Sequence, residues 1–378
     1  CGVEVGRDLT LDDLRSQGYE AFYIAIGCQR GRLPGIPGEN APGVYSAVEF
    51  LRAAAEGKGL QVPGRTVVVG GGNVAIDAAR TARRCGADSV QMFCLEPREK
   101  MPASLEEIAE AEDEDVAIQC GWGPKEILNE GDKVSGVVFM RCTSVWDDQG
   151  RFAPQYDEQD TITVPCDHVV LSIGQSVEWG GLLEGSKVEL ARGGWARADG
   201  KTYQTAQPDV FVGGDVYTGP KFAIDAIAAG KEAAVSLHRF VQPNTSMTIG
   251  RDPRYFVELD KQNIKVEQYD NTQRQIPGMD DSIDWKRSFR DAKRAFTEEQ
   301  VKAETARCLG CGASIVDPNK CIGCGLCTTR CEFDAIHLHR ERPECSTMIK
   351  SEDKMKAILP NMVKREIRIK RAAKKNRK

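Results

Sequence analysis

A glycine-rich turn between a short apolar strand and a helix constrains the fold of this chain more than any other feature. The segment Val67 to Val69 runs into the pattern Gly-x-Gly-x-x-Ala, and residues 75–85 follow with helical character. In such a pattern the first glycine makes a tight turn, the second lets a pyrophosphate approach the backbone, and the alanine packs the helix closely on the strand. A plain packing turn is the alternative. We therefore predict a dinucleotide site made by Gly70, Gly71, Gly72, Asn73, Val74 and Ala75.

A carboxylate stands where the adenosine ribose of such a nucleotide would lie. Glu96 directly follows the expected strand 89–95 and comes 24 positions after Gly72, close to the spacing of about 20 at which an acid meets the ribose. A carboxylate at this place repels a 2′-phosphate, whereas Arg98 offsets that repulsion. The pattern predicts NAD(P)H as a cofactor, with NADH favoured. In the alternative interpretation Glu96 only caps a loop.

Glycines at other strand ends indicate a second nucleotide layer. Gly27 lies near the end of the expected strand 19–28, Gly174 follows 169–173, and Gly213-Gly214-Asp215 follows 210–212. A carboxylate beside glycines that expose the backbone can accept hydrogen bonds from a polyol, although each motif alone also suits an ordinary turn. The candidate residues of this layer are Gly27, Gly174, Gly214 and Asp215.

The order of the expected elements defines the fold class. Strand 66–69, helix 75–85 and strand 89–95 follow one another, which is typical of a parallel sheet in an α/β protein. Later strands without helices between them predict a small antiparallel layer, and the polar stretch 242–296 predicts a linker. The remaining expected elements are a helix from Ser46 to Ala54 with Glu49 as its capping partner, a helix at 105–115, strands at 116–120, 134–142, 161–164 and 169–173, a strand at 210–212, and helices at 223–240 and 297–306.

Cysteines crowd one short part of the chain. Six of the 14 lie between Cys308 and Cys331. Because no export signal is visible, we expect a reducing, cytoplasmic compartment, in which thiolate ligands are favoured over disulfides. The run Cys-x-x-Cys-x-x-Cys-x-x-x-Cys is typical of a bacterial ferredoxin segment, with Glu332 in place of the usual proline. The predicted ligands of a 4Fe-4S cluster are Cys321, Cys324, Cys327 and Cys331, with Cys308 and Cys311 upstream.

Both the fourth ligand and the metal have alternatives. Cys331 or one of the two upstream cysteines completes the cluster, and six thiolates are too few for two clusters, so one cluster is expected. A second cluster would have to recruit Cys345. A zinc ribbon made by Cys308, Cys311, Cys321 and Cys324 is the rival, but it leaves Cys327 and Cys331 unexplained.

Composition excludes several classes of protein. A net charge of −5 excludes a generally basic surface that coats nucleic acid. The apolar runs are far shorter than the roughly 20 residues of a membrane span. The region predicted to bind a nucleotide contains no Cys-x-x-Cys pair, which argues against a disulfide reductase. The tail at 346–378 is basic and is expected either to dock an acidic partner or to be solvated.

Together these motifs resemble the small subunit of glutamate synthase and related flavin- and pyridine-nucleotide-dependent electron-input subunits. The matching stretches are Ala25-Ile26-Gly27, Pro37-Gly38-Glu39 with Gly43-Val44-Tyr45, residues 70–80, residues 98–103, Ile173-Gly174-Gln175, and Gly213-Gly214-Asp215 with Thr218-Gly219-Pro220. The resemblance implies an α/β flavoprotein with two Rossmann-like dinucleotide-binding domains in three layers, with Asp215 on the FAD side. A small α+β ferredoxin-like domain is expected at the C-terminus.

The resemblance also implies a division into domains. The expected parts are an FAD-domain remnant at 1–40, an NAD(P)H domain at 41–160, the return of the FAD domain at 161–242, a linker at 243–300, a 4Fe-4S domain at 301–345 and the basic tail at 346–378. The first FAD fingerprint of the family is absent, so we expect a truncation upstream of Cys1. Leu95 and Glu96 stand where these enzymes often have arginines, which favours NADH.

The resulting expectation is an FAD-dependent NAD(P)H oxidoreductase subunit. It would pass electrons from NAD(P)H through FAD to a 4Fe-4S cluster and on to a redox partner or larger subunit of a hetero-oligomeric complex, without nucleic acid and without a membrane span. One alternative is a glutamate synthase small subunit proper, which feeds an amidotransferase large subunit. Another is a non-catalytic iron–sulfur relay or a zinc-binding interaction module.

Overall fold

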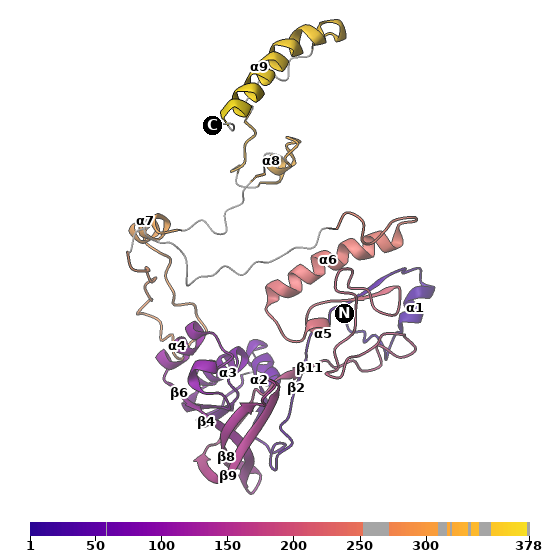
Figure 1. The fold of residues 1–378 in the computed structure, drawn as a ribbon. Coiled ribbons are helices and arrows are strands. Elements are labelled where there is room, and N and C mark those ends of the chain that lie inside the picture. The colour runs from indigo at the N-terminus through magenta and orange to yellow at the C-terminus, as the bar shows by residue number, and fades with distance from the viewer. Residues whose placement is uncertain are drawn as a thin grey trace. The chain divides into compact units, whose positions relative to one another are not determined.

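A parallel sheet of five strands forms the centre of residues 44–171 (Figure 1). In spatial order its strands are β3 (Val44–Ser46), β10 (His168–Leu171), β4 (Gly64–Val69), β5 (Ala87–Cys94) and β6 (Val116–Cys120). Each neighbouring pair runs parallel. The predicted α/β class with a parallel sheet is confirmed.

Helices cover one face of this sheet and a second sheet covers the other. The helices are α2 (Ala47–Ala55), α3 (Asn73–Arg84) and α4 (Leu105–Asp113), and the second sheet consists of antiparallel β7 (Trp122–Glu130), β8 (Lys133–Trp146) and β9 (Phe152–Pro165). Because successive side chains of a strand point to opposite faces, Val68 packs with the helices, whereas Val67 and Val69 pack with the antiparallel sheet. Phe93 of β5 stacks on Phe139 of β8, with ring centroids 4.1 Å apart. The predicted three layers are confirmed.

Two segments that we predict in the antiparallel layer belong to the parallel sheet instead. β6 follows α4 and pairs in parallel with β5, so β5, α4 and β6 form one more strand–helix–strand unit. β10 lies between β3 and β4, and its residues Val169, Val170 and Leu171 are buried. A strand that is covered on both faces has a continuous apolar run and no alternation, which is why the pattern was ambiguous. The antiparallel layer keeps 134–142 and 161–164, within β8 and β9.

A smaller strand pair is built from residues that are far apart in the sequence. β1 (Phe22–Ile24) pairs in parallel with β12 (Val210–Val212), with Ile24 opposite Val212. Beside them lie α1 (Leu11–Ser16), α5 (Asp215–Thr218) and α6 (Ala223–Val241). β1 is shorter than the expected strand 19–28, because only three of its residues pair with β12 and Tyr19 is exposed.

A strap formed by residues 278–294 lies against α3 and α4. It falls inside the stretch whose polar composition predicts a linker. The Ser288 carbonyl accepts a hydrogen bond from Arg84 Nε at 2.9 Å, and Lys286 Nζ pairs with Asp115 at 2.8 Å. Ile283 and Ala292 of the strap are buried. A polar segment can pack here because a backbone carbonyl and a lysine of the strap make polar contacts with residues of α3 and with Asp115, which follows α4.

The structure is a computed structural model that describes residues 1–57, 59–251, 272–308, 316–317, 320–331, 334–339 and 349–375. It has two compact units, Cys1–Ala306 and Arg307–Lys378. The first unit ends with α7 (Glu298–Ala306), and the described residues of the second form α8 (Leu326–Arg330), a short 3-10 helix (Ser351–Asp353) and α9 (Lys354–Lys375). None of the helices within the described ranges has the length and apolar character that a bilayer crossing needs.

Glu114 links α3, α4 and the strap. It is fully buried at the C-terminal end of α4, and its Oε1 lies 2.7 Å from nitrogens of both Arg80 and Arg84. Arg84 is also the residue that binds the strap carbonyl. The other carboxylate oxygen, Oε2, has no hydrogen-bond partner. The single buried carboxylate therefore orients two arginines.

We predict that Glu114→Ala lowers the free energy of unfolding by about 3 kcal/mol, because it removes a buried carboxylate that is the shared counter-charge of two half-buried arginines. Urea denaturation monitored by circular dichroism measures the change. The matched control is Glu112→Ala, which removes the partly exposed Arg98–Glu112 pair and should cost less than about 1 kcal/mol. Equal and small losses in the two variants would contradict this account of Glu114.

Candidate nucleotide and cofactor sites

The turn from β4 into α3 depends on Gly70. Its φ is 143°, and a Cβ at this position would lie 2.3 Å from the carbonyl oxygen of Ser172. Ser172 follows β10, and its amide donates to the carbonyl of Val69 at 2.7 Å. Residue 70 must therefore be glycine both for the backbone conformation and for the close approach of the β10 end.

Gly72 differs from Gly70 because it faces open space. No heavy atom lies within 4 Å of an added Cβ, and its φ of −93° suits any residue. It is the N-cap of α3, where no side chain satisfies the first amides of this 12-residue helix. The buried Ala75 lets α3 approach the sheet closely. Free amides, the positive end of the helix dipole and an open position together fit a pyrophosphate.

Asn73 and Val74 have partners inside the protein. Asn73 Oδ1 accepts a hydrogen bond from the amide of Ser104 at 2.9 Å, which ties the 101–104 loop to the start of α3. Val74 packs against the core on the helix side of the sheet. Both side chains thereby help to hold the turn in place.

Glu96 and Arg98 follow β5 at the same edge of the sheet. A Cβ on Gly71 would lie 2.9 Å from Glu96 Oε2, so this carboxylate rests against the glycine turn. Arg98 begins a short 3-10 helix, and its Nη2 pairs with Glu112 Oε2 at 2.6 Å. The structure therefore brings Glu96 to the turn and directs Arg98 towards α4.

Two cations that pack on tryptophans of the antiparallel layer lie near this edge, and sequence reasoning missed them. The Arg141 guanidinium lies over the ring of Trp122, 3.7 Å from its centroid, and Arg141 Nε pairs with Asp160 at 3.1 Å. Lys100 lies over the ring of Trp146. Trp122 begins β7, a strand absent from the predicted elements, so no sequence signal pointed to this stacking.

Three residues of the predicted second layer, Gly27, Gly214 and Asp215, follow the carboxyl ends of β1 and β12. Gly27 follows β1 with a φ of 68°, and Gly214 follows β12 with φ 67° and ψ −151°, a conformation essentially confined to glycine. The Cys28 thiol donates to the carbonyl of Asp215 at 3.7 Å, which ties the two loops together. A ligand with several hydroxyl groups could therefore hydrogen-bond to the Asp215 carboxylate and approach the backbone at the two glycines.

Cys28 is not a reactive nucleophile at neutral pH. Burial, together with the nearby Asp215 carboxylate, raises the pKa of the Cys28 thiol to about 11. The thiolate is the reactive form of cysteine, so at neutral pH Cys28 stays protonated. Its role is the hydrogen bond that holds the Asp215 loop.

Gly174 lies on one of two connections that run side by side. β2 (Arg30–Gly31), which follows Gly27, pairs in antiparallel fashion with β11 (Gln175–Ser176). The amide of Arg32 donates to the Gly174 carbonyl at 3.0 Å, and Gly174 has a φ of 115°. The segment that follows Gly27 and the segment that follows Gly174 therefore lie side by side.

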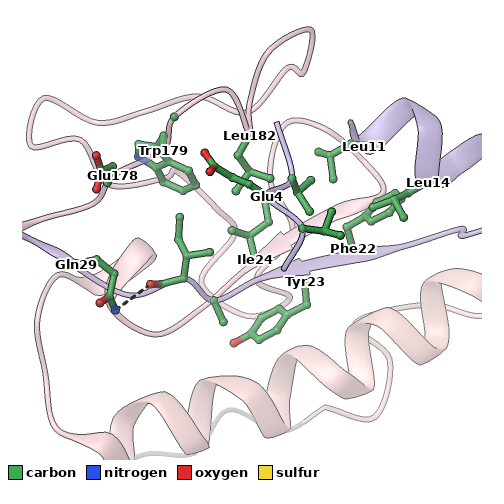
Figure 2. A pocket seen from close by; sticks show the side chains of 15 residues that line it. Glu4, Leu11, Leu14, Phe22, Tyr23, Ile24, Gln29, Glu178, Trp179 and Leu182 are labelled. Atoms are coloured by element: carbon green, nitrogen blue, oxygen red, sulfur yellow. Dashed lines mark hydrogen bonds between the residues drawn. The ribbon is translucent and has the colours of Figure 1, made fainter. Parts of the chain in front are cut away.

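A cavity of about 740 Å³ opens beside β1 (Figure 2). Apolar side chains from α1, β1 and the 179–182 loop line it, together with the carboxylates of Glu4 and Glu178. Gln29 Nε2 donates to the Ile26 carbonyl at 3.3 Å beside it. Gly214 and Asp215 do not line this cavity, whereas its lining residues Ile26 and Gln29 flank the predicted FAD contact Gly27.

The predicted cluster ligands all lie in the second unit, Arg307–Lys378. Cys321, Cys324 and Cys327 are exposed, as is Cys308, and Cys331 Sγ accepts a hydrogen bond from the Ala335 amide at 3.4 Å. Cys311 lies outside the described residues. Within the described part of the chain, no group of three or more His, Cys, Asp or Glu side chains is gathered to hold a metal.

The donor set nevertheless fits an iron–sulfur cluster. Closely spaced thiols with left-handed turns at Gly323 and Gly325 (φ 68° and 78°) suit the ferredoxin pattern.

Comparison with known proteins supports both halves of this arrangement. Residues 3–230 match the family described as pyridine nucleotide-disulphide oxidoreductase, and residues 314–337 match the 4Fe-4S binding domain. The NADP(+)-dependent formate dehydrogenase subunit beta of Moorella thermoacetica is 32% identical over 322 residues, which cover 82% of this chain and 44% of that protein. The glutamate synthase [NADPH] small chain of Escherichia coli K12 is 33% identical, with 64% of this chain and 54% of that protein covered.

A third relative is the NADPH-Fe(3+) oxidoreductase subunit beta of Geobacter sulfurreducens, 26% identical, with 82% of this chain and 50% of that protein covered. The chain thus spans about half the length of these relatives. Among solved structures, FprA from Mycobacterium tuberculosis in complex with NADPH has a TM-score of 0.52 at 21% identity, covering 63% of this chain and 66% of that one. This likeness supports the two-nucleotide-domain fold.

Substitution of Gly70 by alanine should lower stability, whereas substitution of Gly72 should weaken nucleotide binding. Gly70→Ala should destabilise the fold by roughly 1–3 kcal/mol, because its Cβ meets the Ser172 carbonyl and its φ is positive. Gly72→Ala should keep the melting temperature but weaken pyridine nucleotide binding about tenfold, because the methyl group fills the open position. Calorimetric melting and nucleotide titration measure the two effects. Tight nucleotide binding by a stable Gly72→Ala variant would contradict this assignment.

Proposed function

The chain belongs to the pyridine nucleotide-disulphide oxidoreductase family, and on that basis we propose that it forms part of an electron-transfer subunit. In this proposal it takes electrons from a reduced pyridine nucleotide and passes them through FAD and a 4Fe-4S cluster to a partner protein. The observation that carries the proposal is the open space at Gly72, which is next to the uncapped first amides of α3. The same chain also contains a ferredoxin-type cysteine run.

The nucleotide would lie across the carboxyl edge of the parallel sheet. Residues 70–75 would hold the pyrophosphate through the amides of α3, and Glu96 would accept hydrogen bonds from the adenosine ribose. Gly70 and Asn73 act by fixing the turn, through Ser172 and Ser104 respectively. These residues bind and orient, and the proposal needs no acid or base from the protein.

We propose NADH as the preferred donor. Glu96 would repel a 2′-phosphate, and the two arginines near the edge, Arg98 and Arg141, are paired with Glu112 and Asp160. The relatives named above carry NADP(+) or NADPH in their names, and those names describe those proteins. The carboxylate at the end of β5 is the feature of this chain that favours the cofactor without the 2′-phosphate.

FAD would bind at the edge formed by the ends of β1 and β12. Because Gly27 and Gly214 have no side chains, FAD could approach the protein backbone closely at these two positions. Asp215 would accept hydrogen bonds from the hydroxyl groups of FAD. Gly174 would lie on the neighbouring connection. Bound FAD supplies the change from two-electron hydride chemistry to one-electron transfer. Cys28 supports this edge through its hydrogen bond to the Asp215 carbonyl.

A 4Fe-4S cluster would be held by Cys321, Cys324 and Cys327, with Cys331, Cys308 or Cys311 as the fourth ligand. The exposed sulfurs and the glycine turns between them support this assignment. Zinc in the same segment remains the alternative that iron analysis decides.

The partner is proposed to be a larger subunit of a hetero-oligomeric complex. The relatives are named as beta subunits or small chains, which supports this. A glutamate synthase small chain proper, and a relay without nucleotide turnover, are the alternatives. We further propose the domain division given above (1–40 with 161–242, 41–160, 243–300, 301–345 and 346–378) and a reducing, cytoplasmic compartment for the cluster.

Glu96→Ala should lower the preference for NADH. The loss of a charged hydrogen-bond acceptor to the ribose should raise the KM for NADH about tenfold, and the loss of repulsion should lower the KM for NADPH. Steady-state reduction of ferricyanide by the full-length protein measures both. Glu99→Ala, an exposed carboxylate three residues along the chain, is the control and should leave the ratio unchanged. A Glu96→Ala variant with an unaltered ratio would reject Glu96 as the ribose ligand.

Cys324→Ser should remove the cluster and keep the nucleotide site. Iron and acid-labile sulfide in the full-length protein should fall by more than half, because one thiolate of the ferredoxin run is lost. NADH-dependent reduction of ferricyanide should persist, since this acceptor can take electrons from a flavin. The control is Cys142→Ser, a cysteine of β8 outside the run, which should keep its iron. Stoichiometric zinc without sulfide in the unaltered protein would favour the interaction module instead.

A further inference from the structure

Two cysteines from different strands meet beneath the nucleotide turn. Cys94 is the last residue of β5 and Cys120 is the last residue of β6, and they are direct partners in the parallel register. Their sulfur atoms lie 3.7 Å apart, although 26 positions separate them in the sequence. The Cys-x-x-Cys pattern that was missing from the sequence of this region is thus replaced by a pair that the sheet assembles.

The geometry of this pair allows a disulfide. Neighbouring strands are spaced about 4.8 Å apart, which falls inside the range of about 4.4–6.8 Å between the Cα atoms of bonded cysteines. Both cysteines are thiols in the structure. Rotation of the two side chains has to shorten the sulfur separation from 3.7 Å to about 2.05 Å.

The two thiols differ in access and in reactivity. Cys94 is 2% exposed, whereas Cys120 is half-buried. Burial raises the pKa of the Cys94 thiol, and the neighbouring Cys120 raises it further, so Cys94 reacts slowly with an external oxidant. Cys120 is therefore the first thiol to react, and Cys94 is placed to close the bond.

The pair contacts the residues proposed to bind the adenosine end of the nucleotide. The Cys94 thiol donates to the carbonyl of Glu96 at 3.5 Å. A Cβ on Gly71 would lie 2.9 Å from the Cβ of Cys94. Cys120 Sγ lies 3.9 Å from the sulfur of Met101, in the loop that Asn73 ties to α3. The Cys94 sulfur therefore contacts the Glu96 backbone directly, and the Cys120 sulfur reaches the nucleotide turn through Met101.

We propose that Cys94 and Cys120 are a redox-active pair, which a hydroperoxide oxidises to a disulfide that weakens pyridine nucleotide binding. First, the Cys120 sulfur bonds to one peroxide oxygen, the O–O bond breaks, and water or an alcohol leaves. Then the Cys94 sulfur bonds to the Cys120 sulfur, the S–O bond breaks, and hydroxide leaves as water with the Cys94 proton. Two electrons pass from the thiols to the peroxide, and a dithiol reductant reverses the change.

The effect on the nucleotide follows from the lost hydrogen bond. The disulfide has no S–H to donate to the Glu96 carbonyl, so the backbone at Glu96 loses its hydrogen bond from Cys94. The effect on binding rests on the nucleotide site proposed above, whereas formation of the disulfide does not.

Peptide mapping tests the disulfide. After treatment of the full-length protein with hydrogen peroxide, alkylation and trypsin, the peptides 85–98 and 101–125 should be joined, with a mass two hydrogens below the sum of 101–125 and of 85–98 alkylated once. Fragmentation should place the alkyl group on Cys85 and the link between Cys94 and Cys120. Cys120→Ser should abolish the link. Cys142→Ser, a cysteine of similar partial exposure, should retain it. Oxidation of Cys120 to higher acids without any link to Cys94 would overturn the proposal.

Calorimetric titration with NAD+ tests the consequence, and this readout requires neither flavin turnover nor the cluster. The Kd should rise about threefold or more in the oxidised protein, as expected for one lost hydrogen bond, and recover with dithiothreitol. Cys120→Ser treated in the same way should show no change, which controls for peroxide damage elsewhere. An unchanged Kd in fully linked protein would overturn the regulatory role. Failure of the reduced protein to bind any pyridine nucleotide would instead reject the proposed function and leave the peptide map as the test of the pair.

Discussion

The close approach of the β10 end to the β4 turn is the constraint on which the rest of the structure depends. The Ser172 carbonyl occupies the space that a side chain at position 70 would need, and the Ser172 amide bonds to Val69. Because β10 lies beside β4 in the middle of the parallel sheet, this contact fixes where α3 begins and which way its first amides point. This contact between the β10 end and the β4 turn also fixes the position of Gly72, which faces open space, and of Gly71, which the Glu96 carboxylate contacts. One glycine is thus needed for packing, and the other leaves room for a ligand.

The two proposed cofactor edges are joined by short connections, and the cysteine run follows a strap held on the nucleotide layer. β2 and β11 place the segments after Gly27 and Gly174 side by side. The strap is held on α3 and α4 by Arg84, which Glu114 orients, and its residue Lys293 precedes Cys308 by only 15 positions. The elements that we propose to bind the nucleotide therefore also hold the segment that precedes the predicted cluster ligands in the sequence.

The sequence was sufficient where one short motif determines the backbone, and insufficient where distant strands decide the outcome. The Gly-x-Gly-x-x-Ala turn and the Ser46 cap, which accepts from the Glu49 amide, were predictable because their partners lie within a few residues. The placement of β6 and β10 was wrong because an apolar run does not say which neighbour a strand pairs with. The Cys94–Cys120 contact was invisible because the parallel register, and not sequence spacing, creates it. The domain boundaries and the cluster ligands stay predictions.

The central claim is that one chain joins a pyridine nucleotide site to a sulfur-bound iron centre by way of a flavin. Its most direct test is an anaerobic titration of the full-length protein with NADH, followed by visible absorbance and low-temperature electron paramagnetic resonance. The account predicts loss of the flavin band together with the appearance of the signal of a reduced 4Fe-4S cluster, at lower concentrations of NADH than of NADPH. A protein without iron, or one whose flavin keeps its colour with both nucleotides, would contradict it.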